Sequence, residues 1–147
     1  MKPLSIAFTG TREGMSDYQK AAFRMHMTQI MWANKDRFID FHHGGCIGAD
    51  EDAHTILLEI RQHEGLEMVG IEVHPAKVPK RLQAQLHTGV CVLHKPKPPL
   101  KRNMDMVKEC DVLIACPKED HEVQRSGTWT TVRYAKKYNK EVIVIGP

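Results

Sequence analysis

The sequence lacks the features of a membrane protein or of a disulfide-stabilised one. No apolar run approaches the roughly 18 residues that a transmembrane helix needs. Residue 3 leads directly into a strand-like run, so we expect no signal peptide and a cytoplasmic protein. The four cysteines include no C-x-x-C pair. Cys91, Cys110 and Cys116 lie in or beside apolar runs, which predicts buried, reduced thiols.

Charge of one sign and aromatic side chains are also scarce. The formal net charge is only +3, and aromatic residues make up 6% of the chain. Nucleic-acid-binding surfaces need a basic patch, and single strands need aromatic stacking platforms. Nucleic acid is therefore not favoured as a partner, whereas a small anionic ligand suits this balance of charges.

Three common site motifs are missing. No G-K-[ST] follows a glycine loop, which excludes a Walker A sequence, and the strict G-x-G-x-x-G spacing is absent. Nine histidines occur, but none forms a His-x-x-x-His pair or a Cys/His cluster with zinc spacing. The sequence therefore predicts no metal site and no resident cofactor.

The sequence does contain a regular alternation of strand-like and helix-like segments. Apolar runs predict strands at 4–8, 38–41, 68–73, 112–115 and 142–145, with a short one at 90–93. Helical spacing predicts helices at 17–34, 49–62, 101–110 and from 126 onward, the first with a Ser16–Gln19 capping box. Residues 1–147 are therefore expected to form one Rossmann-like, three-layer α/β domain with a mainly parallel sheet.

Three glycine-containing loops follow predicted strands and lead toward helices. They are TGTREG at 9–14, HGGCIGAD at 43–50 and RSGTW at 125–129. Right-handed crossovers place such loops at one edge of a parallel sheet, where ligands of this fold bind. Glycine lets the backbone approach a phosphate, and a helix N-terminus adds free N–H donors and a positive dipole end. Tight turns explain any single loop equally well, but three on one edge predict a phosphate or nucleotide site.

The same loops, with two further strings, resemble a known group of proteins. The strings are FTGTR at 8–12, HGGCIGAD at 43–50, Arg102-Asn103 ahead of Met106, LIA at 113–115 with Pro117, and RSGTWTTVRYA at 125–135. They resemble the SLOG superfamily, Rossmann-like domains related to the DNA-processing protein DprA and to the LOG phosphoribohydrolases. The branch most similar is that of small bacterial and phage proteins labelled DprA-like or YspA-like. The resemblance covers nearly the whole chain and implies a nucleotide-derived ligand.

The resemblance also raises the question of enzymatic activity. LOG hydrolases cleave a base from a ribose 5′-monophosphate with a Gly-Gly-x-Gly-Thr-x-Glu-Glu motif, and here Thr130 and Thr131 stand at the two glutamate positions. A threonine cannot supply the carboxylate that this chemistry needs. The favoured function is therefore a nucleotide sensor, carrier or sequestering module. A phosphoribohydrolase-like enzyme using Asp50 or Glu13 is the alternative, and DprA-like binding of single-stranded DNA is a weaker one.

Several candidate residues have two interpretations. Asp50 could complement a helix dipole, or it could contact the ligand or organise its loop. Arg102 and Asn103 could be solvated, but the resemblance implies phosphate contact or loop anchoring. Trp129 could stack on a base, although its helical spacing favours the core. The expected partner is a nucleotide-like small molecule, without a membrane, and a homo-oligomer stays open. The candidate ligand-binding residues are Gly10, Thr11, Arg12, His43, Gly44, Gly45, Gly48, Asp50, Arg102, Asn103, Arg125, Ser126, Gly127 and Thr128.

Overall fold

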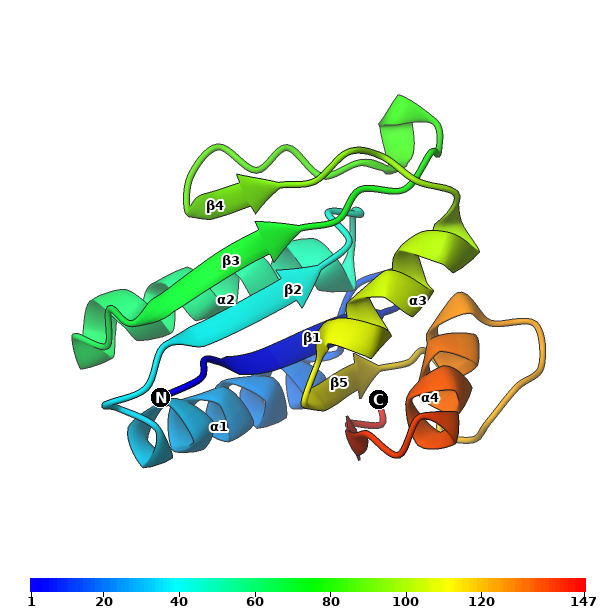
Figure 1. The fold of residues 1–147 in the computed structure, drawn as a ribbon. Coiled ribbons are helices and arrows are strands. Elements are labelled where there is room, and N and C mark those ends of the chain that lie inside the picture. The colour runs from blue at the N-terminus through cyan, green and yellow to red at the C-terminus, as the bar shows by residue number, and fades with distance from the viewer.

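The computed structural model describes residues 1–147, which form a six-stranded parallel sheet with helices on both faces (Figure 1). The strands are β1 (Leu4–Gly10), β2 (Ile39–His43), β3 (Val69–Val73), β4 (Val90–Leu93), β5 (Val112–Cys116) and β6 (Glu141–Val144). The helices are α1 (Asp17–Ala33), α2 (Ala49–Glu64), α3 (Pro99–Glu109) and α4 (Gly127–Lys137), with a 3-10 turn at Lys80–Leu82. The strand order is β4-β3-β2-β1-β5-β6, and every pair is parallel. The predicted Rossmann-like α/β fold is confirmed.

The two faces of the sheet are covered by different pairs of helices (Figure 1). Alternate residues of β1 point to opposite faces, so Phe8 packs with α1 and α2, whereas Ala7 packs with α3 and α4. The face covered by α1 and α2 holds the larger core, in which the rings of Phe8, Phe23 and Phe41 contact one another. The smaller core is centred on β1 and β5. Because these two strands are parallel, the loops that follow them lie at the same edge of the sheet.

The helix boundaries follow the local signals of the sequence. The Ser16 hydroxyl accepts the N–H of Gln19 at 3.0 Å, and the Gln19 side chain accepts the N–H of Ser16 at 3.0 Å. The predicted capping box is thus confirmed. Helix α2 ends at Gly65, which adopts the left-handed conformation with φ of 65°. No helix is both long enough and apolar enough to cross a membrane.

Three sequence-based expectations need correction. β2 was expected to end at residue 41, but it continues to His43, because residues 42 and 43 pair with Glu72 and Val73 of β3. Helix α3 begins at Pro99 rather than at residue 101, since proline is well suited to the first helical turn. Cys91 is exposed rather than buried, because β4 is an edge strand, whereas Cys110 and Cys116 are buried as predicted.

Candidate functional site

A cavity of about 360 Å³ lies at the carboxyl ends of β1 and β5, where the glycine loops meet. The structure places most of the candidate residues in its wall: Gly10, Thr11, Arg12, Gly44, Asp50, Arg102, Asn103, Arg125, Ser126, Gly127 and Thr128. His43, Gly45 and Gly48 do not line the cavity. Glu13 also lies outside it, exposed and paired with Lys118 at 3.0 Å. The topology thus gathers all three loops around one space.

The N-terminus of α4 presents unpaired backbone donors to this cavity. Ser126 caps the helix: its hydroxyl accepts the N–H of Trp129 at 3.2 Å, and its carbonyl accepts the N–H of Thr130 at 2.9 Å. The N–H groups of Gly127 and Thr128 precede the first intrahelical bond, so they are available to a ligand. The first turn contains no acidic residue. This helix end is therefore suited to bind an anion.

The N-terminus of α2 has a different role. Its first turn carries three acidic residues, which already complement the helix dipole. Gly48, at φ of 87°, lies so close to the backbone of Arg12 that a side chain would collide with it. The Ala49 N–H donates to the Thr11 carbonyl at 2.9 Å. Gly48 therefore joins the first two loops rather than facing the ligand.

Arg102 anchors the second loop from α3. Its guanidinium Nη1 donates to the carbonyls of Gly44 at 3.0 Å and His74 at 2.9 Å, and its Nε donates to the Asn103 side chain at 2.7 Å. A Cβ at Gly44 would collide with this guanidinium. Arg102 is buried, with three of its bonds already made inside the protein. These contacts exclude a solvated Arg102 and show that it anchors the loop; Arg102 also lines the cavity, where phosphate contact stays a prediction.

Asp50 is a buried carboxyl group in the cavity wall. Its Oδ2 accepts the N–H of Cys46 at 3.1 Å, which closes the turn that leads into α2. Burial raises the pKa of Asp50 to about 6, although the nearby Arg102 and backbone hydrogen bonds act in the opposite direction. Asp50 therefore changes protonation state in mildly acidic solution.

Asp50→Asn should change how stability depends on pH. The folded-state pKa is raised from 3.8 to about 6, so the folded state holds this proton more tightly than the unfolded chain. The contribution of Asp50 to stability is consequently lost as pH rises from about 4 to about 6. Relative to the Asn variant, the parent should lose on the order of 2–3 kcal/mol over this range, as measured by urea unfolding. The neighbouring variant Glu51→Gln should keep the parental dependence of stability on pH. If Asp50→Asn also keeps the parental dependence, the raised pKa of Asp50 is contradicted.

His43 lies beneath the second loop instead of bordering the cavity. It is fully buried, and it begins a chain of three hydrogen bonds with defined donors. The Gly45 N–H donates to Nδ1 of His43 at 2.9 Å, which leaves Nε2 of the neutral ring as the donor to Nδ1 of His54, 2.9 Å away. Nε2 of His54 then donates to the Thr88 carbonyl at 2.8 Å. Burial lowers the pKa of His43 to about 3, so the ring stays neutral.

The cavity has a cationic rim and a partly apolar wall, of which the sequence indicated only Arg12 and Arg125. Arg12, Lys118 and Arg125 are exposed at the rim, and Pro99 and Met106 of α3 line the wall. Pro99 and Met106 lie on a helix, so no loop motif could assign them to the site. Lys118 could have been found, because it follows directly after the predicted strand at 112–115 and Pro117. Other lining residues absent from the predicted set are Phe8, Thr9, Cys46 and Glu119.

Trp129 belongs to the smaller core and not to the cavity. Its side chain is buried among residues of α3, α4 and β5, and its indole Nε1 donates to Glu119 at 3.1 Å. On the exposed side of α4, Arg133 donates to the carbonyls of Val123 and Gln124 at 3.2 and 3.0 Å. Together these contacts hold the loop that carries Arg125 against α4.

Comparison with known proteins finds similarity in fold alone. No family model matches the sequence, and no curated protein matches it. The fold is similar to that of the molybdenum cofactor binding protein from the phototrophic bacterium Rippkaea orientalis, with a TM-score of 0.69 and 19% identity. It is also similar to the Moco Carrier Protein from Chlamydomonas reinhardtii, with a TM-score of 0.61 and 17% identity. Each alignment covers 100% of this chain and 78% of the other.

Proposed function

We propose that the protein binds a phosphorylated, nucleotide-like small molecule in the cavity and acts as its sensor, carrier or sequestering module. The observation that carries the proposal is the acid-free N-terminus of α4, whose unpaired N–H groups line the cavity beneath a cationic rim. Charge-assisted hydrogen bonds from Arg12 or Arg125 would add to those from the backbone. The cavity lies at the carboxyl ends of parallel strands, where α/β folds bind ligands.

The shape and chemistry of the cavity suggest how such a ligand would lie. Its volume of about 360 Å³ is close to the lower end of the usual range for ligand cavities, which suits a molecule the size of a mononucleotide. The phosphate would bind at Gly127 and Thr128. The organic part would extend toward Pro99 and Met106, which supply apolar surface on the α3 side.

The names of the two similar structures bear on the class of ligand. Both are named for binding or carrying the molybdenum cofactor, which supports a small-molecule cofactor as a candidate. Membership of the SLOG superfamily, inferred from the glycine-loop strings, is part of the same proposal. We accordingly propose that the molybdenum cofactor be tested beside the nucleotides.

The positions of the carboxyl groups favour binding over hydrolysis. The Thr131 hydroxyl donates to the Gly127 carbonyl at 2.8 Å, and the Thr130 hydroxyl accepts from Arg133 at 3.0 Å. Neither threonine lines the cavity. Of the acids that do, Asp50 holds its own loop and Glu119 accepts the Trp129 indole. The hydrolase alternative therefore lacks the pair of free carboxylates that LOG-type chemistry uses.

A thermal-shift panel tests the proposal. Mono-, di- and cyclic nucleotides and the molybdenum cofactor should include a ligand that raises the melting temperature, because binding to the folded state alone stabilises it. At ~100 times its dissociation constant, a ligand adds roughly 2.7 kcal/mol. The dephosphorylated form of that ligand should give a much smaller shift, since the phosphate makes the proposed contacts.

Two results would contradict the proposal. One is a panel that stays flat at millimolar concentrations. The other is rapid release of free base from a nucleoside monophosphate, measured by chromatography, if a folded Asp50→Asn variant no longer shows this release. That second result would assign the protein to the hydrolases instead.

A further inference from the structure

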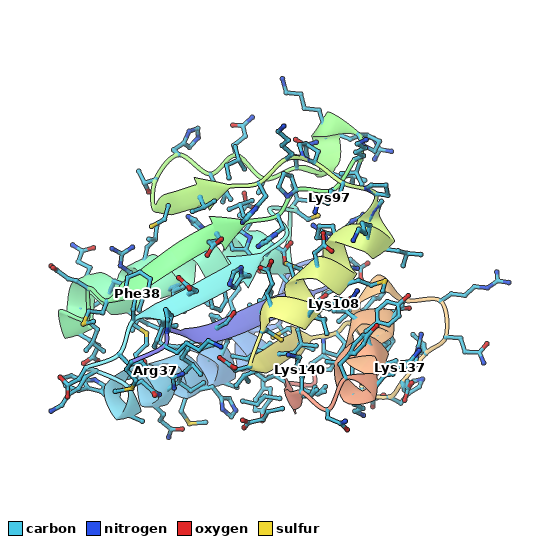
Figure 2. All side chains as sticks on the ribbon, viewed as in Figure 1. Arg37, Phe38, Lys97, Lys108, Lys137 and Lys140 are labelled. Atoms are coloured by element: carbon cyan, nitrogen blue, oxygen red, sulfur yellow. The ribbon has the colours of Figure 1, made fainter.

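The outer half of the sheet carries a cluster of histidine and glutamate side chains away from the cavity. Helices α3 and α4 pack mainly on β1, β5 and β6, so the same face of β2 and β3 has no helix directly over it (Figures 1 and 2). His42 of β2 is the register partner of Glu72 of β3, and His74 follows two residues later on the same side. Strand geometry thus places all three side chains on one face.

The potential ligand atoms of these three residues converge. Nδ1 of His42 is 2.8 Å from Nε2 of His74, and Nε2 of His42 is 3.9 Å from Oε2 of Glu72. One ligand atom from each residue lies within 4.8 Å of the others. His42 is 3% and His74 is 6% exposed, whereas Glu72 is partly open to solvent. The cluster is therefore nearly closed toward the sheet and open on one side.

We propose that His42, Glu72 and His74 bind a divalent transition-metal ion, with zinc as the best match, and leave a fourth position to water. Two imidazole nitrogens and one carboxylate oxygen form a donor set that is common in open zinc sites. With metal–ligand distances of about 2.1 Å, tetrahedral ligand atoms lie about 3.4 Å apart. The 2.8 Å and 3.9 Å distances involve different nitrogens of His42, and only one nitrogen of a ring can bind a given ion. With Nε2 of His42 and Oε2 of Glu72 as ligands, the His42–His74 hydrogen bond would have to open so that the His74 ring could turn toward the same ion.

A second layer of contacts already orients the three groups. Nε2 of His94 lies 2.8 Å from Oε1 of Glu72, which leaves Oε2 for the ion. The His94 ring also stacks on His74, with centroids 3.9 Å apart and an interplanar angle of 12°. Outer-shell bonds of this kind hold metal ligands in position.

Charges of both signs surround the cluster. Asp40 of β2 and Glu109 of α3 both act electrostatically on the His42 environment, as does Glu72 itself. Arg102 opposes them from beside His74, to whose carbonyl it donates. Asp105 of α3 is already paired with Lys97 and Lys101, and Lys97 is labelled in Figure 2. Glu109 and Asp40 thus place negative charge near His42, which favours a bound dication, whereas Arg102, Lys95 and Lys97 line the same pocket as His74 and oppose it.

Titration of chelator-treated protein with zinc chloride tests the site. Because the exposed Cys91 could bind zinc by itself, the parent for this experiment is Cys91→Ser. Calorimetry should show one zinc per chain. Glu72→Gln and His74→Gln should each lower the affinity at least tenfold, whereas the exposed His121→Gln should match the parent.

A second measurement covers variants that fail to fold. Zinc X-ray absorption on the parent should show nitrogen and oxygen neighbours at about 2.0–2.2 Å, including imidazole. The proposal is overturned if the parent binds no zinc, if folded Glu72→Gln and His74→Gln both bind like the parent, or if the spectrum shows no imidazole. In those cases His42 and His74 form only a hydrogen-bonded pair. None of these outcomes depends on whether the cavity binds a nucleotide.

Discussion

Between pH 7 and pH 4 the protein should lose about 3 kcal/mol more of its free energy of unfolding than a His43→Asn variant loses. The pKa of His43 is lowered from 6.5 to about 3, mainly by burial and further by the nearby titratable rings of His54 and His74 and by Arg102. As pH falls below 6.5, His43 of the unfolded chain becomes protonated, whereas His43 of the folded protein stays neutral until about pH 3. The stability contributed by the neutral ring is thus lost at about 1.4 kcal/mol per pH unit, over about 2.5 units to pH 4.

The asparagine variant isolates this effect. Its side-chain oxygen can still accept the Gly45 N–H that Nδ1 of His43 accepts, but it does not titrate. Urea unfolding at several pH values, with a chelator present, gives the two profiles. His63→Gln, an exposed histidine near the end of α2, should follow the parent. Parallel profiles for the parent and His43→Asn would show that His43 is not held neutral. Asp50 contributes with the opposite sign, so each group must be measured as a difference from its own variant.

Local sequence signals were sufficient for most of the fold. The capping box at Ser16 and Gln19 marked the start of α1. β5 is apolar at every position because both of its faces are covered, so it could be recognised as a central parallel strand. Such features depend on residues close together in the chain, which is why a single sequence reveals them.

The end of β2 shows what a local pattern could not decide. The apolar run stops at Phe41, so residues 42 and 43 were assigned to a loop. Pairing with β3 extends the strand by two residues and directs their side chains to opposite faces. His43 consequently enters the larger core beside Phe41, while His42 meets Glu72 on the other face. Neither environment could be inferred without the neighbouring strand.

The position of the cavity could be predicted in part, because it follows from the topology of the sheet. Parallel strands bring their following loops to one edge whatever the loops contain, so the three glycine loops could be placed together. The residues that close the cavity from α3, Pro99 and Met106, depend on where that helix crosses the sheet. The histidine cluster depends on the register between β2 and β3, which no spacing motif records.

Gly127→Val should weaken binding of the phosphorylated ligand at least tenfold, or about 1.4 kcal/mol or more, without unfolding the protein. A Cβ at Gly127 meets no atom within 4 Å, so the branched side chain would occupy open space at the cavity wall where the phosphate is proposed to bind. Thr128→Val keeps the side-chain shape but removes the hydroxyl. It should cost one charge-assisted hydrogen bond, roughly 1.5–3 kcal/mol.

Calorimetry with the ligand that gives the largest thermal shift would measure both losses. Thr130→Val is the matched control, because Thr130 lies on the same helix but outside the cavity, and its hydroxyl accepts a hydrogen bond from Arg133. It should bind like the parent. If both variants are folded and bind like the parent, the phosphate does not lie at the N-terminus of α4.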